Sequence, residues 1–135
     1  MSKRNVELVE EMTERFRAGD RNSWRERIAD DVVWDTSGTE LPNAGVYLGH
    51  EGIERFFIDW LGTWRDLRID SVELIDAGDS VVSIFRWHGR GRTSGVETEV
   101  EMYGMYDLRD EKVIRYRQFD SRAEVIAAAG LANGD

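Results

Sequence analysis

Asp35 is the residue of this sequence that is best placed for acid–base chemistry. It ends a short apolar run, VVWD, and precedes the long loop 36–50, TSGTELPNAGVYLGH. A loop of this length inside a compact domain is more often functional than accidental. A carboxylate at the rim of an aromatic cavity is suited to removing a proton next to a carbonyl group, since desolvation raises its proton affinity. The alternative is that Asp35 caps the loop by accepting the backbone N–H groups of Thr36 or Thr39.

Aromatic residues are the second feature that indicates a small-molecule site. The chain contains 5 Trp, 4 Tyr and 5 Phe, which is more than a small core needs for filling. Core packing explains any single one of them. Together, with Gly104 leaving space beside Phe85 and Tyr116, they predict an apolar pocket with a few polar contacts from tyrosine hydroxyl groups. The residues predicted to line this pocket are Trp34, Tyr47, Phe57, Trp60, Phe85, Trp87, Met102 and Tyr106.

The elements that carry these residues follow the order helix, helix, strand, long helix and four strands. Apolar residues at helical spacing mark the helices, and alternation with period two after Trp64 marks the strands. This order predicts one α+β domain, residues 1–135, in which a strongly curved antiparallel sheet wraps the long helix and the helices cover one face. The predicted helices are 5–18, with Asn5 as N-cap, a short helix from Asn22, Glu51–Trp64 and Ala123–Ala129, and the predicted strands are 31–35, 66–76, 80–92, 95–110 and 112–120.

Hairpin register decides which side chains share a face of the sheet. With Thr93 to Gly95 as the first turn, opposite charges fall opposite one another. The second turn has the pattern of a type I turn with a bulge, and it gives Glu111 a positive φ. The predicted pairs are Arg92–Glu97, Arg90–Glu99, His88–Glu101, Tyr106–Ile114, Gly104–Tyr116 and Met102–Gln118. The face that must receive the long helix then contains Phe85, Trp87, Met102, Gly104 and Tyr106.

The opposite face of the predicted sheet mixes charged and apolar residues. Arg86, His88, Tyr103 and Met105 make it too mixed for simple exposure to solvent, so a homodimer through this face is expected, which light scattering would test. On this face His88 is expected to form an ion pair or a subunit contact rather than to take part in catalysis. His50, at the start of the long helix, is expected to have a local backbone role.

Composition excludes several classes of function. The chain has 18 basic and 27 acidic residues and a net charge of −9, which argues against nucleic-acid and anionic-membrane partners. Without cysteine there is no disulfide, thiolate metal site or thiol nucleophile, and the 2 histidines cannot form a histidine-rich metal site alone. No metal or cofactor is expected. The acidic start, MSKRNVELVEE, is unlike a signal peptide, so a cytoplasmic location is expected.

Four segments resemble the SnoaL-like branch of the nuclear transport factor 2-like superfamily. In chain order they are ADDVVWDTS, NAGVYLGHEGIERFFIDW, LIDAGDSVV and DSRAEVIAAAGL. The resemblance implies a cone-shaped α+β fold over nearly the whole chain. It implies no single activity, because the superfamily includes isomerases, cyclases, dehydratases, epoxide hydrolases and non-catalytic binding proteins, so function has to be argued from the site.

The resemblance implies two functions from different classes. The segment around Asp35 is similar to the one that carries the general base of ketosteroid isomerases, whereas the positions matching the oxyanion donors are Met12 and Gly104, which offer no side-chain hydrogen bond. A cofactor-independent cyclase- or isomerase-like enzyme on a polyketide-, steroid- or terpenoid-like carbonyl compound would use Asp35 as base. Tyr116, Tyr106 or Gln118 would then bind the enolate oxygen. The second hypothesis is a small-molecule binding or accessory domain that kept the pocket without the chemistry.

Overall fold

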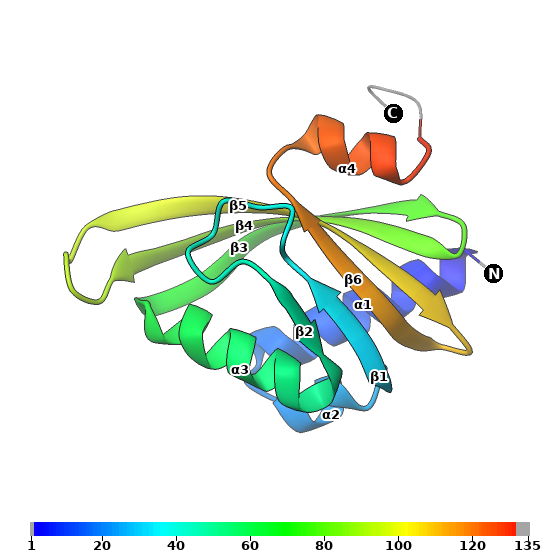
Figure 1. Cartoon of the computed structure of the whole chain (residues 1–135), viewed down its shortest axis with the longest axis horizontal. Helices are drawn as coiled ribbons and strands as arrows, with labels where there is room; N and C mark the ends of the chain where they lie inside the picture. Colours follow the sequence, from blue (N-terminus) through cyan, green and yellow to red (C-terminus); the bar gives the residue numbers. More distant parts are fainter. Residues whose placement is uncertain (1, 132–135) are drawn as a thin grey trace.

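In the computed structural model, which describes residues 2–131, a six-stranded sheet carries helices on both faces (Figure 1). Three helices cover one face, namely α1 (Ser2–Arg17), α2 (Arg21–Arg25) and α3 (Gly49–Gly62), and α4 (Arg122–Ala128) covers the other. The strands are β1 (Ile28–Asp35), β2 (Val46–Leu48), β3 (Trp64–Ala77), β4 (Ser80–Gly91), β5 (Glu97–Arg109) and β6 (Lys112–Phe119). The prediction that all helices share one face is wrong for α4.

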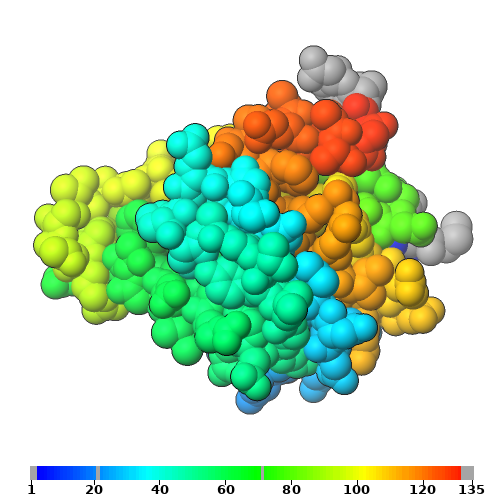
Figure 2. Space-filling view, in the orientation of Figure 1, coloured from blue at the N-terminus to red at the C-terminus, as the bar shows by residue number. Residues whose placement is uncertain are grey.

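The sheet is curved around α3, as the sequence predicts. Its strand order is β2-β1-β6-β5-β4-β3, so β1 and β3 are separated by three other strands. Nevertheless α3 packs against both β1 and β3, which requires the sheet to curl around the helix. In a space-filling view, three segments form the front of the molecule: the loop that follows β1, the strand β2 and the helix α3. The helix α4 protrudes above them (Figure 2).

One strand pair departs from the predicted antiparallel sheet. β3 to β6 form the predicted antiparallel meander and β2 pairs antiparallel with β1, but β1 pairs parallel with β6. Tight turns force neighbouring strands to run antiparallel. β1 and β6 are not joined by a turn, since β2, α3 and three further strands lie between them in the chain. Local sequence therefore carried no information on the direction of this pair.

Both hairpin registers differ from the prediction by two residues. The observed pairs are Arg90–Glu97, His88–Glu99, Arg86–Glu101, Phe85–Met102, Gly104–Gln118 and Tyr106–Tyr116. In the first hairpin the loop is longer than predicted, because the Gly91 N–H donates to the Val96 oxygen (3.0 Å) and Arg92 leaves the strand to bind the Gly62 carbonyl oxygen. Because side chains alternate with a period of two, a shift of two leaves every residue on its predicted face.

The second hairpin has a two-residue turn rather than the predicted type I turn. Asp110 (φ +52°) and Glu111 (φ +65°) both have positive φ, as a type I′ turn requires, and Arg109 pairs with Lys112. The positive φ at Glu111 is confirmed. The irregularity lies in β6, where Ile114 is left without a partner because Asp107 pairs with Arg115 and Leu108 with Val113.

The helices on the inner face begin and end close to their predicted bounds. α1 starts before Asn5, whose side-chain amide donates to the Gly78 carbonyl oxygen instead of capping the helix. It ends before Gly19, which has a φ of +82°. α3 ends at Gly62, so Trp64 starts β3 rather than ending the helix. The apolar residues of these helices that are buried against the sheet are Leu8, Val9, Met12, Ile53, Phe56, Phe57 and Trp60.

The outer face carries a second, smaller apolar core. Val125 and Ile126 of α4 pack on Val82, Ile84 and Met105. The first residue of α4, Arg122, also binds both carboxylate oxygens of Glu73 on β3, at 3.0 Å each. Hydrogen bonding from Arg122 holds the pKa of Glu73 below its usual value. α4 thus occupies part of the face through which a homodimer is expected. A dimer through the remaining part of this face, with Arg86 and His88, stays a prediction.

Candidate functional site

The aromatic residues of the inner face enclose a small cavity. Its volume is about 30 Å³, and the sheet, α1, α2 and α3 all contribute to its wall. Five of the eight predicted pocket residues line it: Trp34, Phe57, Phe85, Trp87 and Tyr106. The remaining lining residues, which the sequence analysis did not assign to the pocket, are Thr13, Phe16, Trp24 and Ile69. Phe16 and Trp24 were detectable as inward-facing residues of the first two helices, whereas nothing in the sequence distinguished Thr13.

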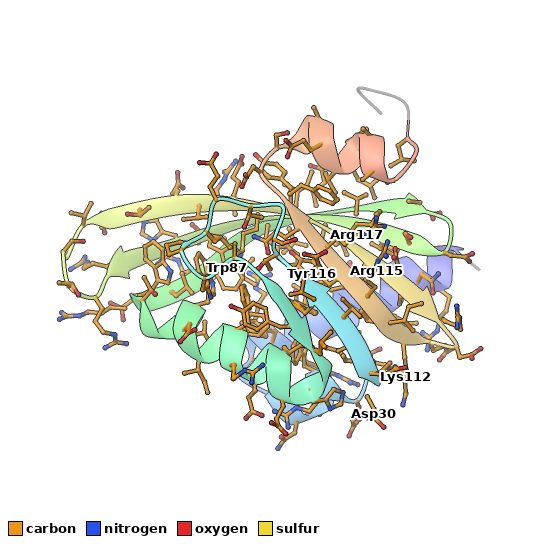
Figure 3. All side chains as sticks on the ribbon, in the orientation of Figure 1. Asp30, Trp87, Lys112, Arg115, Tyr116 and Arg117 are labelled. Carbon is orange, nitrogen blue, oxygen red and sulfur yellow. The ribbon has the colours of Figure 1, made fainter. Side chains whose placement is uncertain are left out.

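A larger cavity, which we call the mouth, adjoins the inner one. It has a volume of about 330 Å³ and lies between the ends of α1 and α3 and the start of β3. Phe16, Ile69 and Trp87 line both cavities, so these side chains form a wall that the mouth and the interior share. Leu61 and Leu67 make the rest of the wall apolar, and Arg17 and Arg68 stand at the edge. Figure 3 shows Trp87 among the side chains between the sheet and α3.

The described residues that line the inner cavity carry hydrogen-bond donors and no carboxylate or imidazole. Among residues 2–131, the indole Nε1 atoms of Trp34 and Trp87 are buried without a hydrogen-bond partner. Burial raises the pKa of Tyr106, so its phenol stays protonated at neutral pH. The Thr13 hydroxyl already donates to the Val9 oxygen at 2.8 Å. None of the described residues lining this cavity is Asp, Glu or His.

Tyr116 and Gln118, two of the three residues assigned to catalysis, lie together beside this cavity. The Tyr116 ring stacks on Trp34, with centroids 4.2 Å apart, and its hydroxyl donates to Gln118 Oε1 at 3.1 Å. Burial raises the pKa of Tyr116, so it remains a donor. The space that Gly104 was expected to leave is filled, because a Cβ atom at Gly104 would overlap the ring and hydroxyl of Tyr116.

Asp35, the third residue assigned to catalysis, lies on the other face of the sheet. Its neighbour Trp34 faces the interior, and Asp35 pairs in register with Arg117. Arg117 reaches Asp107 and the sulfur of Met105, which belongs to the outer core. The Asp35 carboxylate accepts hydrogen bonds from the backbone N–H of Ser37, at 2.9 Å, and from the Ser37 hydroxyl. This is loop capping, made to Ser37 rather than to Thr36 or Thr39.

Replacing Asp35 by alanine is expected to destabilise the fold without weakening ligand binding. Loss of a comparable capping side chain costs about 1 kcal/mol. Urea unfolding of Asp35→Ala measures this change, with Asp31→Ala, an exposed residue of the same strand, as the control. A variant with unchanged stability and lost binding or activity would instead assign Asp35 to the functional site.

The remaining predicted pocket residues lie elsewhere in the core. The Tyr47 hydroxyl donates to the Asn43 carbonyl oxygen and its ring packs edge-on against Phe56, which fastens the loop between β1 and β2. Trp60 contacts Trp64 and Trp87 through edge-to-face ring pairs. Met102 is buried next to its cross-strand partner Phe85.

Comparisons with known proteins identify the family. A family model described as the SnoaL-like domain matches residues 9–116. The chain belongs to the SnoaL-like domain family. This confirms the resemblance seen in the sequence, although a search of curated proteins found no significant match.

Solved structures support the same fold for this SnoaL-like domain. TerC, co-crystallised with polyporic acid, is 21% identical, with 93% of this chain and 98% of TerC covered and a TM-score of 0.73. A candidate polyketide cyclase from Xanthomonas campestris pv. campestris is 21% identical, with 95% and 98% covered and a TM-score of 0.74. A nuclear transport factor 2-like protein from Burkholderia thailandensis is 23% identical, with 95% and 98% covered and a TM-score of 0.76. At these identities the likeness establishes the fold.

Two further observations concern membranes and metals. Among the described helices, none has the length and apolar composition needed to cross a membrane. Within residues 2–131, no group of three or more His, Cys, Asp or Glu side chains is arranged to hold a metal ion.

Proposed function

We propose that this domain binds a small, uncharged, apolar molecule that carries an oxygen acceptor, in the aromatic interior and its mouth. The observation that carries the proposal is the indole N–H of Trp87, which is buried without a partner among the described residues in a wall shared by both cavities. A buried donor without a partner is costly, and an acceptor on a ligand would remove that cost. The TerC structure supports the proposal, since a protein of this fold was co-crystallised with a small molecule, polyporic acid.

The sizes of the two cavities fix how such a ligand would lie. The inner cavity, at about 30 Å³, has room for little more than a water molecule or one oxygen-bearing group. The mouth, at about 330 Å³, is in the range of small-molecule sites. The apolar body would therefore occupy the mouth against Leu61 and Leu67, and a carbonyl oxygen would point inward to Trp87.

Binding is favoured over proton abstraction by the position of the acidic groups. An enzyme of the cyclase or isomerase type needs a base within hydrogen-bond reach of the substrate proton. The described lining residues of the inner cavity include no carboxylate or imidazole, and Asp35 is bonded to Ser37 on the outer face. The protonated hydroxyl of Tyr106 can donate to a carbonyl oxygen but cannot accept a proton from carbon.

Trp87→Phe is expected to remove the preference for an oxygen acceptor. The wild type should bind 2-acetylnaphthalene more tightly than 2-isopropylnaphthalene, which has a similar shape without the oxygen. Loss of one hydrogen bond of about 1 kcal/mol corresponds to a roughly fivefold weaker binding of the ketone. The hydrocarbon should bind the variant unchanged. Isothermal titration calorimetry measures both constants.

Trp64→Phe is the matched control for this experiment. Trp64 also has a buried indole N–H without a partner among the described residues, but it lines neither the inner cavity nor the mouth. It should keep the full preference for the ketone. Equal affinity of the wild type for the ketone and the hydrocarbon would contradict the proposal.

A further inference from the structure

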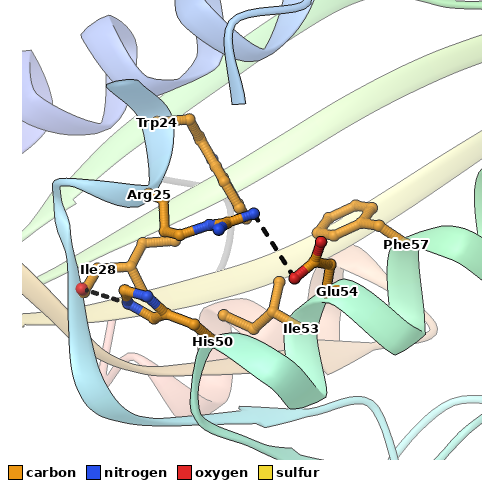
Figure 4. A pocket seen from close by; sticks show the side chains of 7 residues that line it. All are labelled: Trp24, Arg25, Ile28, His50, Ile53, Glu54 and Phe57. Atoms are coloured by element: carbon orange, nitrogen blue, oxygen red, sulfur yellow. Dashed lines mark hydrogen bonds and ion pairs between the residues drawn. The ribbon is translucent and has the colours of Figure 1, made fainter. Parts of the chain in front are cut away.

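A separate cavity lies at the other side of α3, away from the mouth. It has a volume of about 250 Å³. Side chains of α2, of the first residue of β1 and of α3 between His50 and Phe57 line it (Figure 4). Only Trp24 and Phe57 line both this cavity and the inner aromatic cavity, so these two rings form the partition between them. The proposed function does not use its polar side chains.

The floor of this cavity is apolar and firmly held. Trp24, Ile28, Ile53 and Phe57 are each at most 9% exposed. The rings of Trp24 and Phe57 pack edge to face, with centroids 5.6 Å apart. A rigid apolar floor of this kind accepts the ring or the branched chain of a small molecule without first having to form.

The rim carries two opposite charges that are not bonded tightly to each other. The Arg25 guanidinium lies 3.7 Å from the Glu54 carboxylate, which is an ion pair but longer than a hydrogen bond. The two side chains are 36% and 54% exposed. Exposed pairs of this kind contribute little to stability, so Arg25 can turn into solvent and release Glu54 at small cost.

His50 adds an imidazole ring to the same rim. Its Nε2 lies 2.8 Å from the Ile28 carbonyl oxygen. A carbonyl oxygen can only accept a hydrogen bond, so Nε2 carries the proton and, in the neutral ring, Nδ1 has a free lone pair. His50 and Glu54 are four residues apart on α3 and therefore neighbours on one face of the helix. The carboxylate of Asp30, 3.9 Å from Nε2, adds negative charge nearby.

We propose that this cavity binds a small primary amine with an aromatic or branched apolar body. The body lies on Trp24, Ile53 and Phe57. The ammonium group has three donors, which suit the Glu54 carboxylate and the His50 lone pair on the same helix face. The net charge of −9 favours a cation over an anion at this surface. The site is independent of the ligand proposed for the aromatic interior.

The test uses 2-phenylethylamine as the probe and 3-phenylpropionate as its anionic counterpart. Calorimetry and ¹H–¹⁵N NMR shifts of the full chain should show binding of the amine with shifts centred on Ile53 and Glu54. Glu54→Gln should weaken binding of the amine at least about tenfold, because the substitution removes the counter-charge. Arg25→Gln should strengthen it about threefold, because it removes the competing cation. Glu51→Gln, an exposed residue of the same helix that does not line the cavity, should change nothing.

Several results would overturn this proposal. Tighter binding of 3-phenylpropionate, lost in Arg25→Gln, would show an anion site instead. Equal weakening by Glu54→Gln and Glu51→Gln would show general attraction to an acidic surface. If the amine competes with 2-acetylnaphthalene, it occupies the mouth and not this cavity. Failure of the ketone to bind, with the amine binding as expected, would contradict only the function proposed for the interior.

Discussion

Gly104→Ala is expected to lower the free energy of unfolding by about 3 kcal/mol, which is large for the addition of one methyl group. A Cβ atom at this position would overlap the ring and hydroxyl of Tyr116. Neither side can give way easily, since Gly104 is in the middle of β5 and the Tyr116 ring stacks on Trp34 and tilts against Tyr106. Moving the ring would also break its hydrogen bond to Gln118 and leave buried polar groups unpaired. Urea unfolding measures the change.

Two further variants separate this clash from a general sensitivity of the sheet. Ser83 lies directly opposite Gly104 on β4, is 1% exposed, and its hydroxyl has no partner among the described residues. Ser83→Ala should therefore be neutral or stabilising. In a Tyr116→Leu background, Gly104→Ala should cost much less than it does alone, giving a coupling energy in the double-mutant cycle. Additive effects of the two substitutions would contradict the proposed clash.

The faces of the strands could be predicted from sequence, although the pairing could not. Met102 and Tyr106 are in the inner core, and Tyr103 and Met105 pack in the outer one, as the alternating pattern indicates. The predicted pairs were wrong by two residues because the pairing of two strands depends on the turn between them. The backbone conformations of a turn, such as the positive φ of Asp110, cannot be read from the residue types alone. An error of one residue would have reversed both faces.

The position of Asp35 outside the interior could have been predicted from the sequence. Adjacent residues of a strand point to opposite faces, so Trp34 and Asp35 cannot both face the interior from a regular strand. Trp34 has the stronger reason to be buried, which already favours loop capping for Asp35. The sequence could not predict that Tyr116 fills the space over Gly104, because this depends on the observed register of β6 and on the rotamer of Tyr116.

The sequence also does not show which face of the sheet α4 covers. Its N-cap residue Ser121 accepts the Glu124 N–H at 3.2 Å, and Gly130 follows the helix with a φ of +73°. Local signals thus fixed the helix. They did not fix its face, because a seven-residue helix with only Val125 and Ile126 buried has too short an apolar stripe to show which side of the sheet it covers.

Val125→Asp is expected to detach α4 from the sheet and to lower the free energy of unfolding by about 3 kcal/mol or more. Val125 is 0% exposed against the outer face, and an unpaired carboxylate in this place is costly to bury. Detachment relieves that cost but exposes the apolar surface of Val82, Ile84 and Met105. Amide hydrogen exchange should show lost protection along α4 with protection retained in β4 and β5.

Ala127→Asp is the control for this prediction, because it introduces the same charge at an exposed position of the same helix and should leave α4 docked. The interior site gives a second control. The mouth and the inner cavity are lined from the opposite face of the sheet, so 2-acetylnaphthalene should bind Val125→Asp with the affinity of the wild type once the variant is folded. Retained protection of α4 would contradict the role given to Val125. Loss of ketone binding in a variant that still protects β4 and β5 would show instead that the two faces are coupled through the sheet, because Val82, Ile84 and Met105, on which α4 packs, line neither the mouth nor the inner cavity.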